Sequence, residues 1–149
     1  MFGSPTRPLA PAPKGNVADV ETADPEIAAA RGRPRASLEH FWSRLGAPAP
    51  GEAGCTVKIG LPTRTGSLEN IWVRDIRRAG EVITGRLAND PVDIAGLRGD
   101  SPVTFKAADI SDWSYKRNGR FIGNELGRVL VERMPAAERT KYRAMFAER

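Results

Sequence analysis

The sequence is poor in the residues that bind metals and form covalent cross-links. It contains one cysteine, Cys55, and one histidine, His40, among 149 residues. A single cysteine cannot form an internal disulfide, and it cannot supply the several thiolates of a usual structural zinc site. We therefore expect a reduced, cytoplasmic setting and no bound metal or other cofactor.

Long apolar segments are also missing. No stretch approaches the roughly 20 apolar residues that a helix needs to cross a bilayer. The first 15 residues, MFGSPTRPLAPAPKG, lack the apolar core of about 7 to 15 residues that a secretory signal contains. The sequence therefore predicts neither export nor insertion into a membrane.

Motifs for nucleophilic catalysis are absent as well. His40 lies next to Phe41 in a predicted helix, so a Ser-His or Cys-His pair would need a distant partner, and a helix-flank histidine is the simpler interpretation. Cys55 begins a strand among small residues without a basic cluster, which favours a buried, inert thiol. GLRGDS, residues 96–101, lacks the lysine and the following helix of a phosphate-binding loop. The sequence thus favours a protein without enzymatic activity.

What the chain does contain is enough apolar material for a core. Hydrophobic residues make up 40% of it, and it has three tryptophans, Trp42, Trp72 and Trp113. This length and composition predict a single soluble globular domain. The formal net charge is +5, and the first 54 residues hold six charges of each sign, so the basic excess lies in residues 55–149. This mild bias is compatible with an anionic partner.

The N-terminal third divides into a leader and two helical segments. Four prolines among the first 13 residues predict a disordered leader over residues 1–23. Asp24-Pro25-Glu26 has the pattern of an N-cap followed by a proline in the first helical turn. Gly32 and Pro34 should break or kink this helix.

A second helical segment should begin after Ser37, which can act as its N-cap. An apolar stripe at helical spacing must then pack on the rest of the domain; it consists of Leu38, Phe41, Trp42 and Leu45. GAPAPGEAG, residues 46–54, is typical of a loop.

From Cys55 onward the apolar period changes from helical to alternating. The pattern predicts strands over 55–61, 69–78 and 81–89, with a turn at Ala79-Gly80 and a bulge near Arg74 and Asp75. Asn89-Asp90-Pro91 ends the third strand, and a further strand follows over 102–106.

Asn118-Gly119 predicts a two-residue type I′ hairpin turn, so residues whose numbers sum to 237 should face each other. Tyr115 then pairs with Ile122, and Lys116 with Phe121, while Arg117 faces Arg120 at the tip. Trp113, Tyr115 and Ile122 should form the core face. By alternation, Asp112 should point to the opposite face, away from that packing.

The helical period returns after Gly123. Leu126, Val129 and Leu130 predict one helix, and ERTKYRAMF after Pro135 predicts another, with Tyr142, Met145 and Phe146 on its apolar side. The fold class is therefore α+β. We expect a curved antiparallel sheet of five or six strands, a meander or partly open barrel, flanked by N- and C-terminal helices within one domain over 24–149.

Three spaced elements, ENIWVRDIRR, GRLANDPVDIAGLRGDSPVTF and ISDWSYKRNGRFIGN, carry a resemblance. In this order they resemble the bacterial YegJ-like family, a domain of unknown function with recurring Trp, Asn-Asp-Pro, Gly-Asp and Ile-x-Asp-Trp elements. The similarity covers about residues 55–131, and SLEHFWSRL and VLVERMP look like the flanks of longer members. The resemblance implies the same fold and leaves the chemistry open.

Three functions stay open from the residues. Five aspartates at strand ends or turns could supply acid-base or cation chemistry as a carboxylate-dependent hydrolase; they are Asp75, Asp90, Asp93, Asp100 and Asp112. A basic hairpin tip of Lys116, Arg117 and Arg120 could bind nucleic acid. The third function, which we favour, is a non-catalytic module that binds a protein or a small ligand. Its site would consist of Trp72, Asn89, Asp90, Asp112 and Trp113.

Overall fold

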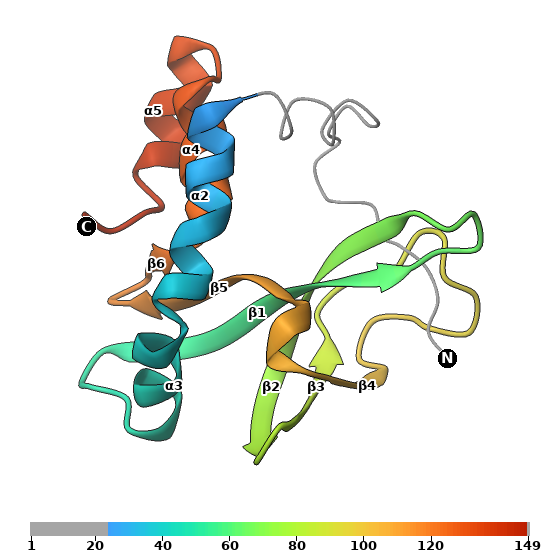
Figure 1. Cartoon of the computed structure of the whole chain (residues 1–149). Helices are drawn as coiled ribbons and strands as arrows, with labels where there is room; N and C mark the ends of the chain where they lie inside the picture. The colour runs from blue at the N-terminus through green and yellow to red at the C-terminus, as the bar shows by residue number, and fades with distance from the viewer. Residues whose placement is uncertain (1–23, 149) are drawn as a thin grey trace. The chain divides into compact units, whose positions relative to one another are not determined.

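The computed structural model describes residues 24–148, and the predicted leader lies outside these residues. The α+β prediction is confirmed: in the described part, the chain forms an open, antiparallel, six-stranded sheet with four α-helices (Figure 1). The strand order is β4-β3-β2-β1-β5-β6. In chain order the elements are α2 (Pro25–Ala36), α3 (Leu38–Gly46), β1 (Glu52–Pro62), β2 (Leu68–Ala79), β3 (Val82–Leu87), β4 (Pro102–Phe105), the 3₁₀ turn η1 (Ala107–Asp109), β5 (Ile110–Arg117), β6 (Arg120–Gly123), α4 (Glu125–Glu132) and α5 (Ala136–Arg143).

The described chain divides into two compact units. Unit 1 consists of residues 56–111, and unit 2 consists of residues 24–55 and 112–148. Strands β1 and β5 each contribute residues to both units. A single domain over 24–149 therefore stays a prediction.

Unit 1 contains the predicted meander. Val57 of β1 pairs with Val73 of β2, and β2 continues into β3 across the tight turn after Ala79. The register between β2 and β3 shifts between Arg74 and Arg77, and Asp75 has a φ of 54°, so the predicted bulge is confirmed. Its effect is to keep Ile76 buried together with Val73.

Helix α2 begins as the sequence predicts but ends later. The Asp24 carboxylate accepts hydrogen bonds from the backbone N–H groups of Glu26 and Ile27, as an N-cap does. The helix does not break at Gly32 or Pro34 and continues to Ala36. Ser37 is not a side-chain N-cap for α3, because its hydroxyl donates backward to the carbonyl of Arg33.

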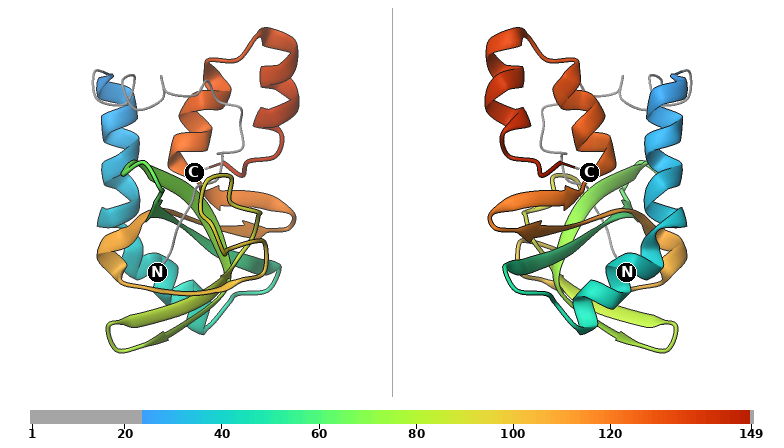
Figure 2. Two further views of the ribbon diagram at one scale, coloured as in Figure 1. Left: turned by 90° about the vertical axis from the view of Figure 1, so that its right-hand side faces the viewer. Right: turned by 90° about the vertical axis from the view of Figure 1, so that its left-hand side faces the viewer.

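The core of unit 2 forms between helices and strand β5. Ile27 and Ala30 of α2 pack against Val129 of α4, and Figure 2 shows α4 and α5 as a helical hairpin. On α3, Phe41 and Trp42 are buried as predicted, with their rings edge to face at 5.3 Å.

The β5-β6 hairpin is confirmed in its register and its turn. Tyr115 pairs with Ile122 and Arg117 with Arg120, while Asn118 and Gly119 have φ values of 51° and 82°. A type I′ turn requires positive φ at both positions, which explains why the Asn-Gly pair predicted the position of the turn.

Two boundaries and one buried face differ from the prediction. Strand β1 begins at Glu52, inside the predicted loop 46–54. Helix α5 ends at Arg143, so Met145 and Phe146 lie beyond it, and Phe146 forms a β-bridge instead. On α4 the buried side chains are Val129 and Val131, whereas Leu130 is exposed.

Within residues 24–148, none of the helices is both long enough and apolar enough to span a lipid bilayer.

Candidate functional site

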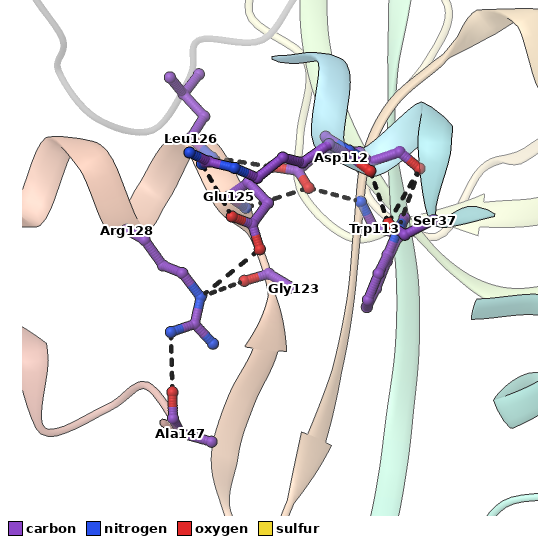
Figure 3. Close-up of polar contacts among 10 residues, drawn as sticks. Ser37, Asp112, Trp113, Gly123, Glu125, Leu126, Arg128 and Ala147 are labelled. Atoms are coloured by element: carbon purple, nitrogen blue, oxygen red, sulfur yellow. Dashed lines mark hydrogen bonds and ion pairs between the residues drawn. The ribbon is translucent and has the colours of Figure 1, made fainter. Parts of the chain in front are cut away.

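Asp112 lies in unit 2, on β5, and its carboxylate is buried at 2% exposure. Oδ1 accepts hydrogen bonds from the backbone N–H groups of Trp113, at 2.9 Å, and Glu125, at 3.3 Å, while Oδ2 accepts from Leu126, at 3.3 Å (Figure 3). Alternation along β5 predicted that Asp112 points away from the face of Trp113 and Tyr115, and it did not predict that the carboxylate is buried. The first turn of α4 covers the side chain, so the carboxylate is interior.

The reason lies at the start of α4. Asn124 occupies the N-cap position in the left-handed region, with a φ of 53°, and its side chain makes no capping bond. The first backbone N–H groups of the helix therefore lack a local acceptor. Asp112 supplies that acceptor from a neighbouring strand and places negative charge at the positive end of the helix dipole.

Trp113 is buried within unit 2 and is held there by hydrogen bonds and ring contacts. Its side chain is 5% exposed, and its indole N–H donates to the carbonyl of Pro34 at 3.2 Å and to the Ser37 hydroxyl at 3.1 Å. Its ring stacks on that of Tyr115 with an interplanar angle of 7°. Gly123 permits this packing, because a Cβ there would lie 2.4 Å from the Trp113 carbonyl oxygen.

One arginine of the basic hairpin tip has an acidic partner at the start of β1. The Glu52 side chain is 2% exposed and accepts from the Arg117 guanidinium at 3.1 Å, and Arg44 lies 3.8 Å away. This carboxylate explains how Arg117 can face Arg120 across the turn. Lys116 is placed over the Phe121 ring, at 5.1 Å from its centroid.

Arg117 also reaches the buried hydroxyl of Tyr115, which lies 2.9 Å from Nε2 of His40. His40 itself is exposed, as expected for a histidine on the flank of a helix. Burial, and then the charge of Glu52, raise the pKa of Tyr115. The pKa of Cys55 is raised for the same two reasons, so the thiol form is favoured, although the side chain is only half-buried.

We expect Glu52 to make the stability of unit 2 depend on pH. The hydrogen bond from the Ala49 backbone N–H, together with Arg117, holds the pKa of Glu52 below its ordinary value. A depressed pKa stabilises the fold above the unfolded-state pKa, and this stability is lost as the pH falls through the folded-state pKa. The urea midpoint of Glu52→Gln should therefore fall less than that of the parent between neutral pH and about pH 3. Glu39→Gln, an exposed change on α3, is the control, and a parallel decline in the Glu52→Gln variant would contradict the expectation.

Three of the predicted site residues lie in unit 1. Trp72 on β2 is half-buried, and the Lys58 ammonium lies 5.2 Å from its ring centroid. The backbone N–H of Ala88 donates to the carbonyl of Trp72, so the exposed residues Asn89 and Asp90 follow directly after its cross-strand neighbour. The register thus brings Trp72, Asn89 and Asp90 to one end of the β2-β3 pair. Asp112 and Trp113 belong to unit 2.

The loop over residues 88–101 is held in a defined conformation. Glu69 of β2, 3% exposed, accepts from the backbone N–H groups of Val92, at 2.9 Å, and Asp93, at 3.2 Å. Ile94 is buried, and Asp90 accepts from the N–H of Gly99 at 2.7 Å. Glu69 was not among the site residues predicted from the sequence. The available signal was its position two residues before Ile71 and four before Val73, which places it on the buried face of the strand.

The other predicted aspartates also have partners. Asp75 and Asp100 both bind the Arg74 guanidinium, and Asp93 accepts from Arg64 at 2.9 Å. Within residues 24–148, no three His, Cys, Asp or Glu side chains are grouped so that they could hold a metal ion.

Comparisons with known proteins give one family and one relative. The sequence profile of a family described as "Uncharacterized protein conserved in bacteria (DUF2314)" matches residues 24–147. A protein of Neisseria meningitidis serogroup B, named "Putative ankyrin repeat protein", is 29% identical over 132 residues, which are 84% of this chain and 52% of that protein. The chain therefore spans about half the length of this curated relative. No solved structure matches the chain significantly.

Proposed function

Since the chain belongs to this family of proteins conserved in bacteria, we propose that it is a non-catalytic module that binds a protein partner. The binding surface that we propose lies in unit 1 and includes Trp72, Asn89 and Asp90. Asp112 and Trp113 would support the module from within unit 2 rather than touch the partner.

The observation that carries this proposal is that the acidic side chains are engaged in contacts within the protein. Each of the five aspartates considered for catalysis binds an arginine or a backbone N–H group within its own unit. Acid-base chemistry needs a carboxylate that is positioned toward a substrate. Aspartates engaged in structural contacts of this kind favour a scaffold over a hydrolase.

The surface around Trp72 has the composition of a recognition site. A half-buried tryptophan with a lysine ammonium over its ring combines an aromatic side chain with a positive charge, and tryptophan is among the residues that dominate binding energy at protein interfaces. The loop over 88–101 starts beside it with the exposed residue Asn89. Because Glu69 already orders this loop, binding would cost little conformational entropy.

The relative adds a second line of support. Its name describes an ankyrin repeat protein, and such repeats stack into extended surfaces that bind other proteins. A protein that combines this kind of domain with repeats would be suited to protein recognition. The narrower YegJ-like affiliation is part of the same proposal, supported by the order of Trp72, Asn89-Asp90-Pro91, Gly99-Asp100 and Asp112-Trp113.

An affinity experiment tests the proposal. The full chain, immobilised, should retain a protein from a native bacterial extract that has been treated with nuclease. After purification of that protein, Trp72→Ala should weaken its affinity at least about 10-fold, because a truncated interface tryptophan usually costs about 2 kcal/mol or more. Asn89→Ala should weaken it in the same direction.

Arg120→Ala is the matched control, since Arg120 is exposed on the hairpin of unit 2. It should leave the affinity unchanged. Equal affinity of Trp72→Ala and the parent, with unchanged urea midpoints, would overturn the proposal. Retention that occurs only in extract left untreated with nuclease, and that Arg120→Ala lowers, would instead support nucleic-acid binding by the hairpin.

A further inference from the structure

The outer edge of β6 in unit 2 is occupied by the chain's own residues 145–147. Phe121 donates its backbone N–H to the carbonyl of Met145 at 2.8 Å, and its carbonyl accepts from Ala147 at 2.9 Å. Phe121 and Phe146 thus form a parallel β-bridge. β6 stands last in the strand order, and the edge of a last strand is where an extended segment can add to a sheet.

Arg128 of α4 fixes this segment. Its guanidinium donates to three carbonyls, those of Gly123 at 2.9 Å, Phe121 at 3.0 Å and Ala147 at 2.8 Å. Figure 3 shows the side chain extending from α4 between Gly123 and Ala147. The guanidinium also lies 5.0 Å from the ring centroid of Phe146. One side chain therefore recognises the strand edge, the added backbone and the aromatic ring.

The aromatic contacts give this edge a side-chain preference. The rings of Phe121 and Phe146 lie 5.6 Å apart, and Phe146 lines a surface hollow of about 220 Å³. The side chain of the neighbouring residue, Met145, is 44% exposed and therefore contributes little to the contact with β6. Recognition thus rests on one aromatic side chain and on backbone hydrogen bonds.

The helix that leads into this segment is lightly connected to the rest of unit 2. This helix, α5, has no buried residue, and an ion pair between Arg143 and Glu132 holds its end to α4. Elements with few buried apolar contacts open at low free-energy cost. Residues 145–147 can therefore leave the edge without unfolding the core around Trp113.

We propose that the β6 edge is a recognition site for an extended segment of another protein, and that residues 145–147 are its internal occupant. The partner segment carries an aromatic side chain at the position of Phe146, is followed by a small residue, and runs parallel to β6. Arg128 binds the partner's backbone carbonyl and its aromatic ring. This site is separate from the Trp72 surface, so an experiment can disprove either proposal without affecting the other.

A peptide that copies the occupant tests the site. The probe is a fluorescein-labelled peptide of residues 141–148, KYRAMFAE, titrated against the full chain. The parent should bind it weakly, because a tethered occupant competes at an effective concentration of about millimolar. The full-length variant Phe146→Ala should bind at least about 10-fold more tightly, since its own segment has lost the aromatic contact. Met145→Ala, which changes an exposed side chain, is the matched control and should behave like the parent.

A second variant provides an independent test in case the first variant does not fold. Ala147→Pro removes the N–H that binds Phe121 and should also increase peptide affinity. The gain should disappear with Phe146→Ala/Arg128→Met and with a probe whose phenylalanine is alanine. Far-UV circular dichroism verifies that the variants are folded. Folded variants that bind no more tightly than the parent would overturn the proposal. A concentration-dependent dimer of the parent would overturn it in favour of exchange of this segment between two copies.

Discussion

Replacement of Trp42 with alanine should lower the free energy of unfolding by about 3–5 kcal/mol. Trp42 is 8% exposed, and its ring packs against Phe41, which contacts the ring of Trp113 at 5.6 Å. Truncation removes a large apolar surface from the core of unit 2 and leaves a cavity that this aromatic cluster cannot fill. Equilibrium urea unfolding followed by far-UV circular dichroism measures the loss.

Leu45→Ala is the matched control for Trp42, because Leu45 lies on the same helix and is half-buried. Its effect should be clearly smaller. If the Trp42 variant unfolded at the same urea concentration as the parent, α3 would be a detachable arm, and the packing described for unit 2 would not contribute to stability.

Asp112→Ala should destabilise the protein by about 2–4 kcal/mol, because it leaves buried backbone donors unpaired and removes the cap of α4. Asp112→Asn should cost less, about 1–2 kcal/mol, since the amide keeps one acceptor oxygen. That oxygen can still accept from Trp113 and Glu125, but the NH₂ group then faces the N–H of Leu126. Urea unfolding of both variants gives the two values.

The control for Asp112 is Asn124→Gly. Asn124 makes no capping bond with its side chain and has a positive φ, so glycine should change stability by less than about 0.5 kcal/mol. If instead both Asp112 variants were as stable as the parent and lost binding to the purified partner, Asp112 would belong to a binding site and not to the scaffold.

Features that depend on neighbouring residues could be predicted from the sequence. The hairpin register follows from Asn118-Gly119, because these residues accept the positive φ that the turn demands. The bulge near Asp75 was detectable because Ile71 and Val73 alternate regularly whereas Ile76 is out of phase. Each of these signals lies within about six residues of the feature that it specifies.

The candidate site could not be predicted in the same way. Asp112 was selected from a dipeptide pattern, but two of its partners are the N–H groups of residues 125 and 126, which only the fold brings within reach. The alternation rule assigned it to the face opposite Trp113, but the rule treats the sheet alone and therefore did not predict that α4 covers that side chain. Similarly, the break expected at Pro34 ignored tertiary contacts, and Pro34 is buried with its carbonyl bound to Trp113.

The cap that Asp112 provides also has a consequence for the order of folding. Asp112 and the helix that it caps are 13 to 14 residues apart, and Arg128 binds carbonyls only five and seven residues before it. Closing such short loops costs little chain entropy. The contacts of α2 with this region span 79 to 107 residues. We therefore infer that β5, β6 and α4 assemble early as a local nucleus, and that α2 docks late in the folding of the chain.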